Sequence, residues 1–261
     1  RLFDLDESDT PADVAGCPPD YFTDDGQWWG NPVYAWKEHA ADGFAWWLDR
    51  IGTQARRFDG LRIDHFRALE SFWAIPRDAE SAREGRWLPS PGNELLAAIR
   101  AGYPELSIVA EDLGVITDPV RELRDYFDLP GMAILQFAFD GSPDNPYLPD
   151  NHTRRSVVYT GTHDNDTTVG WFNSLDEQTR AHVTEVIGAG PMPRALIDAA
   201  YASVANTAIV PMQDLLGLDT DARMNVPGTA EGNWEWRFSW SDVPADFAAR
   251  YYELAVASDR V

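Results

Sequence analysis

Cysteine and lysine are nearly absent from this sequence of 261 residues. Cys17 is the single cysteine, which excludes an intrachain disulfide and a cluster of thiolate metal ligands. Lys37 is the single lysine, and 21 lysine and arginine residues stand against 43 aspartate and glutamate residues, a formal net charge of −22. This charge argues against nucleic acid, which favours a basic surface, and against anionic membranes, but it leaves neutral substrates unaffected.

Long hydrophobic runs are also missing. No apolar stretch reaches the roughly 18 residues that a membrane helix needs, and neither end of the sequence has the pattern of a signal peptide. We therefore expect a cytoplasmic, globular protein.

Helical and strand patterns alternate along most of the sequence. Residues 1–35 are the exception, because they are rich in Asp, Pro and Gly without periodicity, and we expect one long ordered loop there. The alternation predicts an α/β fold with parallel strands, and the lack of a linker predicts one domain over residues 1–261. The expected helices are 44–55, 90–101, 118–126, 175–188 and 194–205, and the expected strands are 60–64, 106–110, 132–137, 157–160 and 208–211.

Three of these short apolar runs turn abruptly polar at their C-terminal ends, where they carry Asp64, Glu111 and Asp164. In a parallel α/β sheet, ligands bind at the carboxyl ends of the strands. Cleavage of a glycosidic bond needs a pair of carboxyl groups, one to attack and one to protonate. The pattern therefore favours sugar chemistry.

The surroundings of these three residues suggest different roles. Side chains alternate along a strand, so Arg62 and Asp64 share one face, and the arginine keeps the acid ionised, as a nucleophile requires. A purely structural ion pair is the alternative interpretation. Glu111 follows a wholly apolar run, which favours its protonated form, as an acid/base requires. Asp164, beside His163, could hydrogen-bond sugar hydroxyls and stabilise the transition state.

Three blocks containing these residues resemble the catalytic blocks of the amylomaltases, the 4-alpha-glucanotransferase (disproportionating enzyme) branch of the alpha-amylase superfamily. They are DGLRIDHF at 59–66, AEDLG at 110–114 and THDND at 162–166. Residues 16–35 resemble the loop that covers the active site in that family. Further similar segments are QDLLG at 213–217, RMNVPGT at 223–229 and GNWEWR at 232–237.

The resemblance implies a (β/α)8 barrel that here lacks roughly its first three strands, since five strands are visible and a closed barrel needs eight. We therefore interpret the sequence as a fragment without its N-terminal part. The resemblance implies transfer of α-1,4-glucan segments to glucose or another glucan, with maltooligosaccharides and amylose as partners and with no cofactor or metal. Asp64 would be the nucleophile, Glu111 the acid/base and Asp164 the transition-state stabiliser. It also implies substrate-binding residues, namely Arg62, His163, Tyr21, Phe22, Trp28, Asn31 and Asp112.

Three alternatives stay open. An amylase-type hydrolase or an inactive carbohydrate-binding fragment would also use the aromatic residues, although a binding module has no need of Glu111. A metal-dependent enzyme could use the acids with His65, His152 or His163, but the sequence has no ligand spacing of the His-x₃-His kind. For Trp234 and Trp236 we expect core packing.

Overall fold

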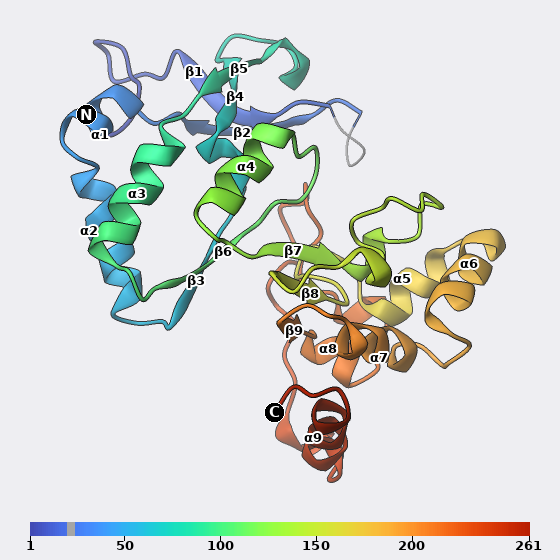
Figure 1. Cartoon of the computed structure of the whole chain (residues 1–261). Helices are drawn as coiled ribbons and strands as arrows, with labels where there is room; N and C mark the ends of the chain where they lie inside the picture. Colours follow the sequence, from blue (N-terminus) through green and yellow to red (C-terminus); the bar gives the residue numbers. More distant parts are fainter. Residues whose placement is uncertain (20–23) are drawn as a thin grey trace. The chain divides into compact units, whose positions relative to one another are not determined.

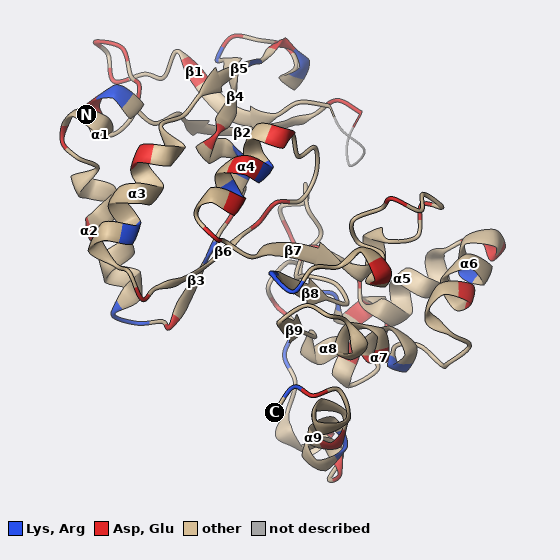
Figure 2. Cartoon of the chain, viewed as in Figure 1, with Lys and Arg blue, Asp and Glu red and all other residues tan. Residues whose placement is uncertain are grey.

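The computed structural model describes residues 1–19 and 24–261, which form two compact units, residues 1–131 and residues 132–261 (Figure 1). Each unit is described by itself, and the single domain expected over the whole sequence stays a prediction. Acidic residues are distributed over helices and loops of both units rather than gathered in one segment (Figure 2). None of the helices in the described ranges is long and apolar enough to cross a membrane.

The first unit contains a four-stranded antiparallel sheet. Its strands are β1 (Asp13–Cys17), β2 (Gln27–Pro32), β4 (Ser71–Pro76) and β5 (Arg86–Pro89), in the order β2-β1-β4-β5. Two sequence predictions were therefore wrong: residues 1–35 are not one long loop, and strand pairing is not parallel throughout.

Gly16 explains why β1 could not be predicted from the sequence. A side chain at Gly16 would lie 2.3 Å from the carbonyl oxygen of Gln27 on β2 and 2.4 Å from Cδ1 of Ile75 on β4. The strand is thus crowded from both neighbours, and only glycine allows the backbones to approach. A register shift between Val14 and Gly16 further hides the alternating pattern that marks a strand.

The first unit also holds a parallel pair, β3 (Gly60–Ile63) with β6 (Ser107–Ala110), in a register that sets Ile63 opposite Ala110. Both strands were predicted, as were the helices of this unit at positions 44–55, 90–101 and 118–126. Those helices are α2 (Ala45–Ala55), α3 (Gly92–Gly102) and α4 (Asp118–Tyr126), and a short helix α1 (Trp36–Ala41) precedes them.

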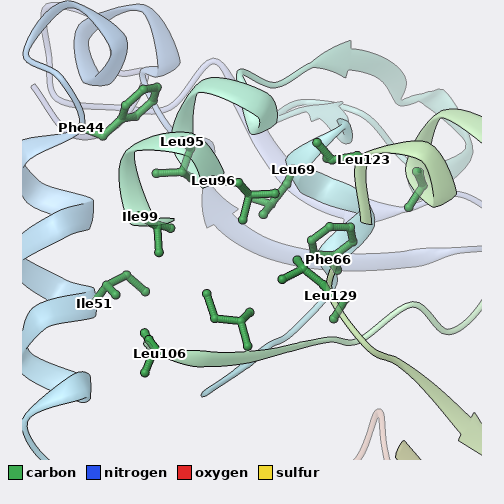
Figure 3. Close-up of a cluster of buried hydrophobic side chains, with 13 residues drawn as sticks. Phe44, Ile51, Phe66, Leu69, Leu95, Leu96, Ile99, Leu106, Leu123 and Leu129 are labelled. Carbon is green, nitrogen blue, oxygen red and sulfur yellow. The ribbon is translucent and has the colours of Figure 1, made fainter. Parts of the chain in front are cut away.

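A hydrophobic core lies between these helices and the parallel pair (Figure 3). Leu61 and Ile63 of β3 pack against it, together with fully buried side chains such as Phe66, Leu96 and Ile99. The alternation along β3 is confirmed, since Arg62 is exposed while its two neighbours are half-buried. One face of β3 therefore anchors the strand and the other is free to present polar groups.

The second unit is built around the sheet β7-β8-β9, in which β8 and β9 are parallel. The strands are β7 (Gly131–Ile134, which begins at the last residue of the first unit), β8 (Ser156–Tyr159) and β9 (Thr207–Ile209). The predicted strand 132–137 is shorter than expected, because its last residues turn into a 3-10 helix. The helices are α5 (Thr168–Ser174), α6 (Glu177–Ile187), α7 (Arg194–Ala202), α8 (Met212–Leu215) and α9 (Phe247–Ala257).

The architecture is thus a mixed α/β one in which parallel pairs and an antiparallel sheet coexist. Closure of a barrel is not seen among the described strands. The 3-10 helices are Phe66–Leu69, Ala82–Glu84, Leu135–Phe137, Pro149–Asn151, Thr220–Ala222 and Trp240–Asp242.

Candidate active site

Asp64 follows directly on β3, at the carboxyl end of the strand. Its carboxylate forms an ion pair with the guanidinium of Arg62, which lies on the same face two residues earlier. The side chain of Asp64 is 75% exposed and that of Arg62 is 30% exposed. Asp64 therefore presents an accessible carboxylate with a cation beside it.

Glu111 follows on β6, the parallel neighbour of β3, so the two carboxyl groups lie at the same edge of the sheet. The N–H of Leu113 donates to Oε1 over 2.9 Å and the N–H of His65 donates to Oε2 over 2.6 Å. Burial raises the pKa of Glu111, and these two backbone donors oppose the rise. The negative charge of Asp64 adds to the rise, whereas the positive charge of Arg62 opposes it.

These two neighbouring carboxyl groups lie in different environments. Asp64 is exposed and ion-paired, whereas Glu111 is largely buried and has a raised pKa. Two carboxyl groups in contrasting environments at one site are typical of enzymes that combine acid and nucleophilic catalysis.

A cavity of about 600 Å³ lies within the first unit and reaches Asp64. Aromatic side chains line much of it, including those of Trp29, Tyr34 and Trp47, and the polar groups of Asn31, Arg62 and Asp64 face it as well. Aromatic faces with a few polar groups are the surface that sugar rings contact.

Asp164 and His163 follow β8 in the second unit. Nε2 of His163 lies 3.3 Å from Oδ2 of Asp164, and Nδ2 of Asn225 donates to Oδ1 over 2.6 Å. The guanidinium of Arg223 donates to the backbone carbonyl of Asp164 over 2.7 Å. Two residues of the 223–229 segment therefore hold Asp164, and the side chain keeps 49% of its surface exposed.

A buried carboxylate supports the loop that carries Asp164. Oδ2 of Asp214 accepts hydrogen bonds from the hydroxyls of Thr160 and Thr168, at 2.6 and 2.7 Å, and Oδ1 accepts the N–H of Thr168. Because Thr160 and Thr168 flank the segment with His163 and Asp164, Asp214 fixes both of its ends. Burial raises the pKa of Asp214, and its hydrogen bonds oppose the rise. Sequence analysis assigned Asp214 no role beyond its place in the 213–217 segment.

The remaining predicted binding residues are scattered over the first unit. Trp28 and Asn31 lie on β2, where the indole of Trp28 is 41% exposed. The carboxylate of Asp112 is buried and forms an ion pair with Arg124 on α4 at 2.5 Å, so it is engaged with the protein itself. Tyr21 and Phe22 lie outside the described residues.

The structure thus brings Asp64, Glu111 and Arg62 together in the first unit, and Asp164 and His163 together in the second. The expectation that Trp234 lies in a core was wrong, since its side chain is 55% exposed and its ring lies 5.2 Å from that of His163. No group of three His, Cys, Asp or Glu residues that could hold a metal ion occurs in the described part of the chain.

Sequence reasoning considered His65 only as a possible metal ligand, whereas the structure places its backbone N–H on the carboxyl group of Glu111. Burial and the positive charge of Arg67 lower the pKa of the His65 imidazole to about 4, although Asp64 acts in the other direction. The ring is therefore neutral near pH 7. It packs edge-on against Trp29, with ring centroids 4.8 Å apart.

Comparison with known proteins links the chain to glucan-transferring enzymes. The family model for 4-alpha-glucanotransferase, glycoside hydrolase family 77, matches residues 1–242. A 4-alpha-glucanotransferase of Synechocystis sp. is 51% identical over 237 residues, which are 89% of this chain and 47% of that protein. A 4-alpha-glucanotransferase of Thermus thermophilus is 44% identical over 269 residues, 99% of this chain and 54% of that protein.

Solved structures agree. The amylomaltase from Streptococcus agalactiae in complex with acarbose aligns with a TM-score of 0.95 at 38% identity, covering 99% of this chain and 53% of that one. The amylomaltase from Corynebacterium glutamicum aligns with a TM-score of 0.76 at 21% identity, covering 96% of this chain and 42% of that one, which compares the fold alone. The chain spans about half the length of the curated relatives it matches. Because the family model covers nearly all of its residues, the chain belongs to the 4-alpha-glucanotransferase family.

Proposed function

We propose that the protein containing these residues is a 4-alpha-glucanotransferase that moves α-1,4-glucan segments from a donor to the 4-hydroxyl of glucose or another glucan. Membership of the family supports the activity. The observation that supports the mechanism is the contrast at one sheet edge between the ion-paired, exposed Asp64 and the buried Glu111 with its raised pKa. A retaining reaction needs such a pair, about 5–5.5 Å apart.

In the first half of the reaction, the Asp64 carboxylate attacks the anomeric carbon of the donor. The bond from that carbon to the glycosidic oxygen breaks, and Glu111 gives its proton to the departing oxygen. The donor segment is then bound covalently to Asp64, and Glu111 is left as a carboxylate.

In the second half, the 4-hydroxyl of an acceptor sugar attacks the same anomeric carbon. Glu111 takes the proton of this hydroxyl, the bond to Asp64 breaks, and both carboxyl groups return to their starting states. Two inversions at one carbon retain its configuration, so the new bond is again an α-1,4 bond.

Asp164 and His163 are proposed to hydrogen-bond the donor sugar at the cleavage point, and Arg62 to hold the same sugar from the side of Asp64. The contacts of Asn225 and Arg223 support this role for Asp164, because they fix its carboxylate while leaving part of it accessible. Preorganised polar groups of this kind favour a charged transition state.

Transfer has to compete with hydrolysis, because water is in excess over any acceptor sugar. An acceptor held in the correct orientation gains an effective molarity of about 10⁵ M or more, which is enough to win if water is kept out. Trp28 and Asn31, exposed on β2, support a covering and groove-lining role for residues 16–35. Tyr21 and Phe22 are proposed to lie over the site, and Asp112 to contact substrate.

For the intact protein we propose a (β/α)8 barrel, of which this chain lacks roughly the first three strands. The parallel pairs β3-β6 and β8-β9 support it, with Asp64 and Glu111 directly after β3 and β6 and Asp164 in the segment that follows β8. Its partners are proposed to be maltooligosaccharides, amylose and glucose, and acarbose bound by the Streptococcus agalactiae amylomaltase supports this ligand class. A cytoplasmic location stays a prediction.

The test is incubation of the full natural polypeptide with maltotriose, followed by chromatography of the products. Transfer yields a ladder of longer and shorter glucans together with glucose, whereas an amylase-type hydrolase yields only shorter sugars. Asp64→Asn is expected to abolish turnover, because an amide cannot form the covalent intermediate. Full activity of this variant would show that the nucleophile is another residue.

A further inference from the structure

The end of β3 and the turn that follows it form several hydrogen bonds with Glu111. The N–H of Glu111 donates to the carbonyl of Ile63 over 3.0 Å, and the N–H of Phe66 donates to the carbonyl of Glu111 over 3.0 Å. Between these two ladder-like bonds, the N–H of His65 donates to the side chain of Glu111, at Oε2, over 2.6 Å. One short turn thus bonds both the main chain and the carboxyl group of the same residue.

His65 has φ of 47° and ψ of 52°, a left-handed conformation that is uncommon outside glycine. This conformation reverses the chain direction immediately after Asp64, because an extended residue would continue the line of β3. We propose that His65 is a positioning residue for Glu111, and that its left-handed backbone turns the 65 N–H onto Oε2. This inference rests on the proposed role of Glu111 as acid/base.

The arrangement fixes where the catalytic proton is carried. Each oxygen of Glu111 accepts one backbone N–H, Oε1 from Leu113 and Oε2 from His65. Each oxygen has two lone-pair directions, and a proton on the carboxyl group occupies one that no amide faces. The two amides therefore orient the acid, and neither donor belongs to a side chain.

The histidine side chain is suited to this position for two reasons. Histidine, like asparagine, adopts the left-handed region more readily than most residues, and β-branched residues adopt it least. The ring is also neutral near pH 7, because burial and Arg67 lower its pKa to about 4. A neutral ring does not add a positive charge that would ionise Glu111, on which Asp64 and Arg62 already act with opposite signs.

The test compares two variants that both lack the ring. His65→Gly keeps the left-handed backbone at little cost, whereas His65→Val disfavours it. The titration midpoint of the Glu111 carboxyl group is followed by ¹³C NMR of labelled glutamate side chains in the full natural polypeptide, with Glu111→Gln to assign the signal. We expect the midpoint in His65→Gly to match the native one, and that in His65→Val to rise by about one pH unit or more, because a bond to the charged form is lost.

If the Glu111 titration midpoint is the same in the native chain and in His65→Val, the proposal is overturned. It is also overturned if the midpoint rises equally in His65→Gly and His65→Val, because the effect then comes from loss of the ring. If His65→Val does not fold, replacement of the 65 amide by an ester removes the N–H alone and carries the same expectation. The readout does not depend on glucan transfer. Absence of transfer in the maltotriose assay would therefore contradict the proposed function. The positioning of Glu111 by His65 would still be decided by the titration alone.

Discussion

Replacing Arg124 by methionine is expected to destabilise the first unit, because it leaves the buried Asp112 carboxylate without the cation that faces it. The side chain of Asp112 is 7% exposed and that of Arg124 is 24% exposed, with NH1 2.5 Å from Oδ2. Removing one partner of a fully buried ion pair costs about 3–5 kcal/mol. Since Arg124 is partly open to solvent, we expect a loss of about 2–3 kcal/mol in the free energy of unfolding.

The same arginine provides its own control. Its guanidinium also contacts Asp125 at 2.8 Å, but the side chain of Asp125 is 54% exposed. Exposed ion pairs contribute at most about 1 kcal/mol, so Asp125→Asn is expected to change stability little. The two acids thus bond one cation and differ in burial.

The assay is urea unfolding followed by tryptophan fluorescence, with amide exchange at Ala110, whose N–H donates to the carbonyl of Pro130, as a local readout. A double-mutant cycle of Asp112→Asn and Arg124→Met isolates the interaction between the two side chains. A coupling energy below about 0.5 kcal/mol would refute the reasoning and return Asp112 to its predicted role in substrate binding.

Three further changes test other parts of the molecule. Asp214→Asn is expected to gain stability relative to the native chain as pH rises above about 4. Burial raises the folded-state pKa of Asp214 above its ordinary value, so the native chain loses the stabilisation of its protonated form as pH rises; equal pH slopes in urea unfolding would contradict this. Gly16→Ala is expected to lower the free energy of unfolding by about 1–3 kcal/mol, because the added methyl group would clash with the Gln27 carbonyl. The matched control Gly102→Ala, whose methyl group would meet only Leu48 at 3.9 Å, is expected to be neutral or stabilising in thermal melts. Arg260→Met is expected to lower the free energy of unfolding by about 2–3 kcal/mol, because its guanidinium donates to carbonyls at the end of α7, including those of Tyr201 and Ser203. Unchanged amide exchange in α7 would contradict this.

The parallel strands could be predicted from the sequence because their signal is local. In β3 and β6 an apolar run is followed at once by an acid, and the alternation along β3 places Leu61 and Arg62 on opposite faces without knowledge of any partner. The roles of Asp64 and Glu111 were inferred from the same few residues. The structure shows Asp64 ion-paired and Glu111 buried, and the two roles stay predictions.

The antiparallel sheet could not be predicted in this way, because its strands depend on distant partners. Gly16 is read as a loop residue until Trp73, far along the chain, is known to lie opposite it. Asp112 is a similar case, since only the position of Arg124 on α4 shows that its carboxylate is buried. The contribution of His65 is a backbone N–H in a left-handed turn, which no pattern of side chains reports.

The pairing of β1 with β4 has a consequence for how sequences of this kind can change length. The chain between β1 and β4, residues 18–70, carries β2 and β3, and the pairing of β1 with β4 holds its two ends together. The entropic cost of closing a loop grows only with the logarithm of its length, by about 0.6 kcal/mol for each doubling. Insertions between β1 and β3 are therefore inexpensive in stability, and the segment proposed to cover the substrate can diversify without loss of the strand that carries Asp64.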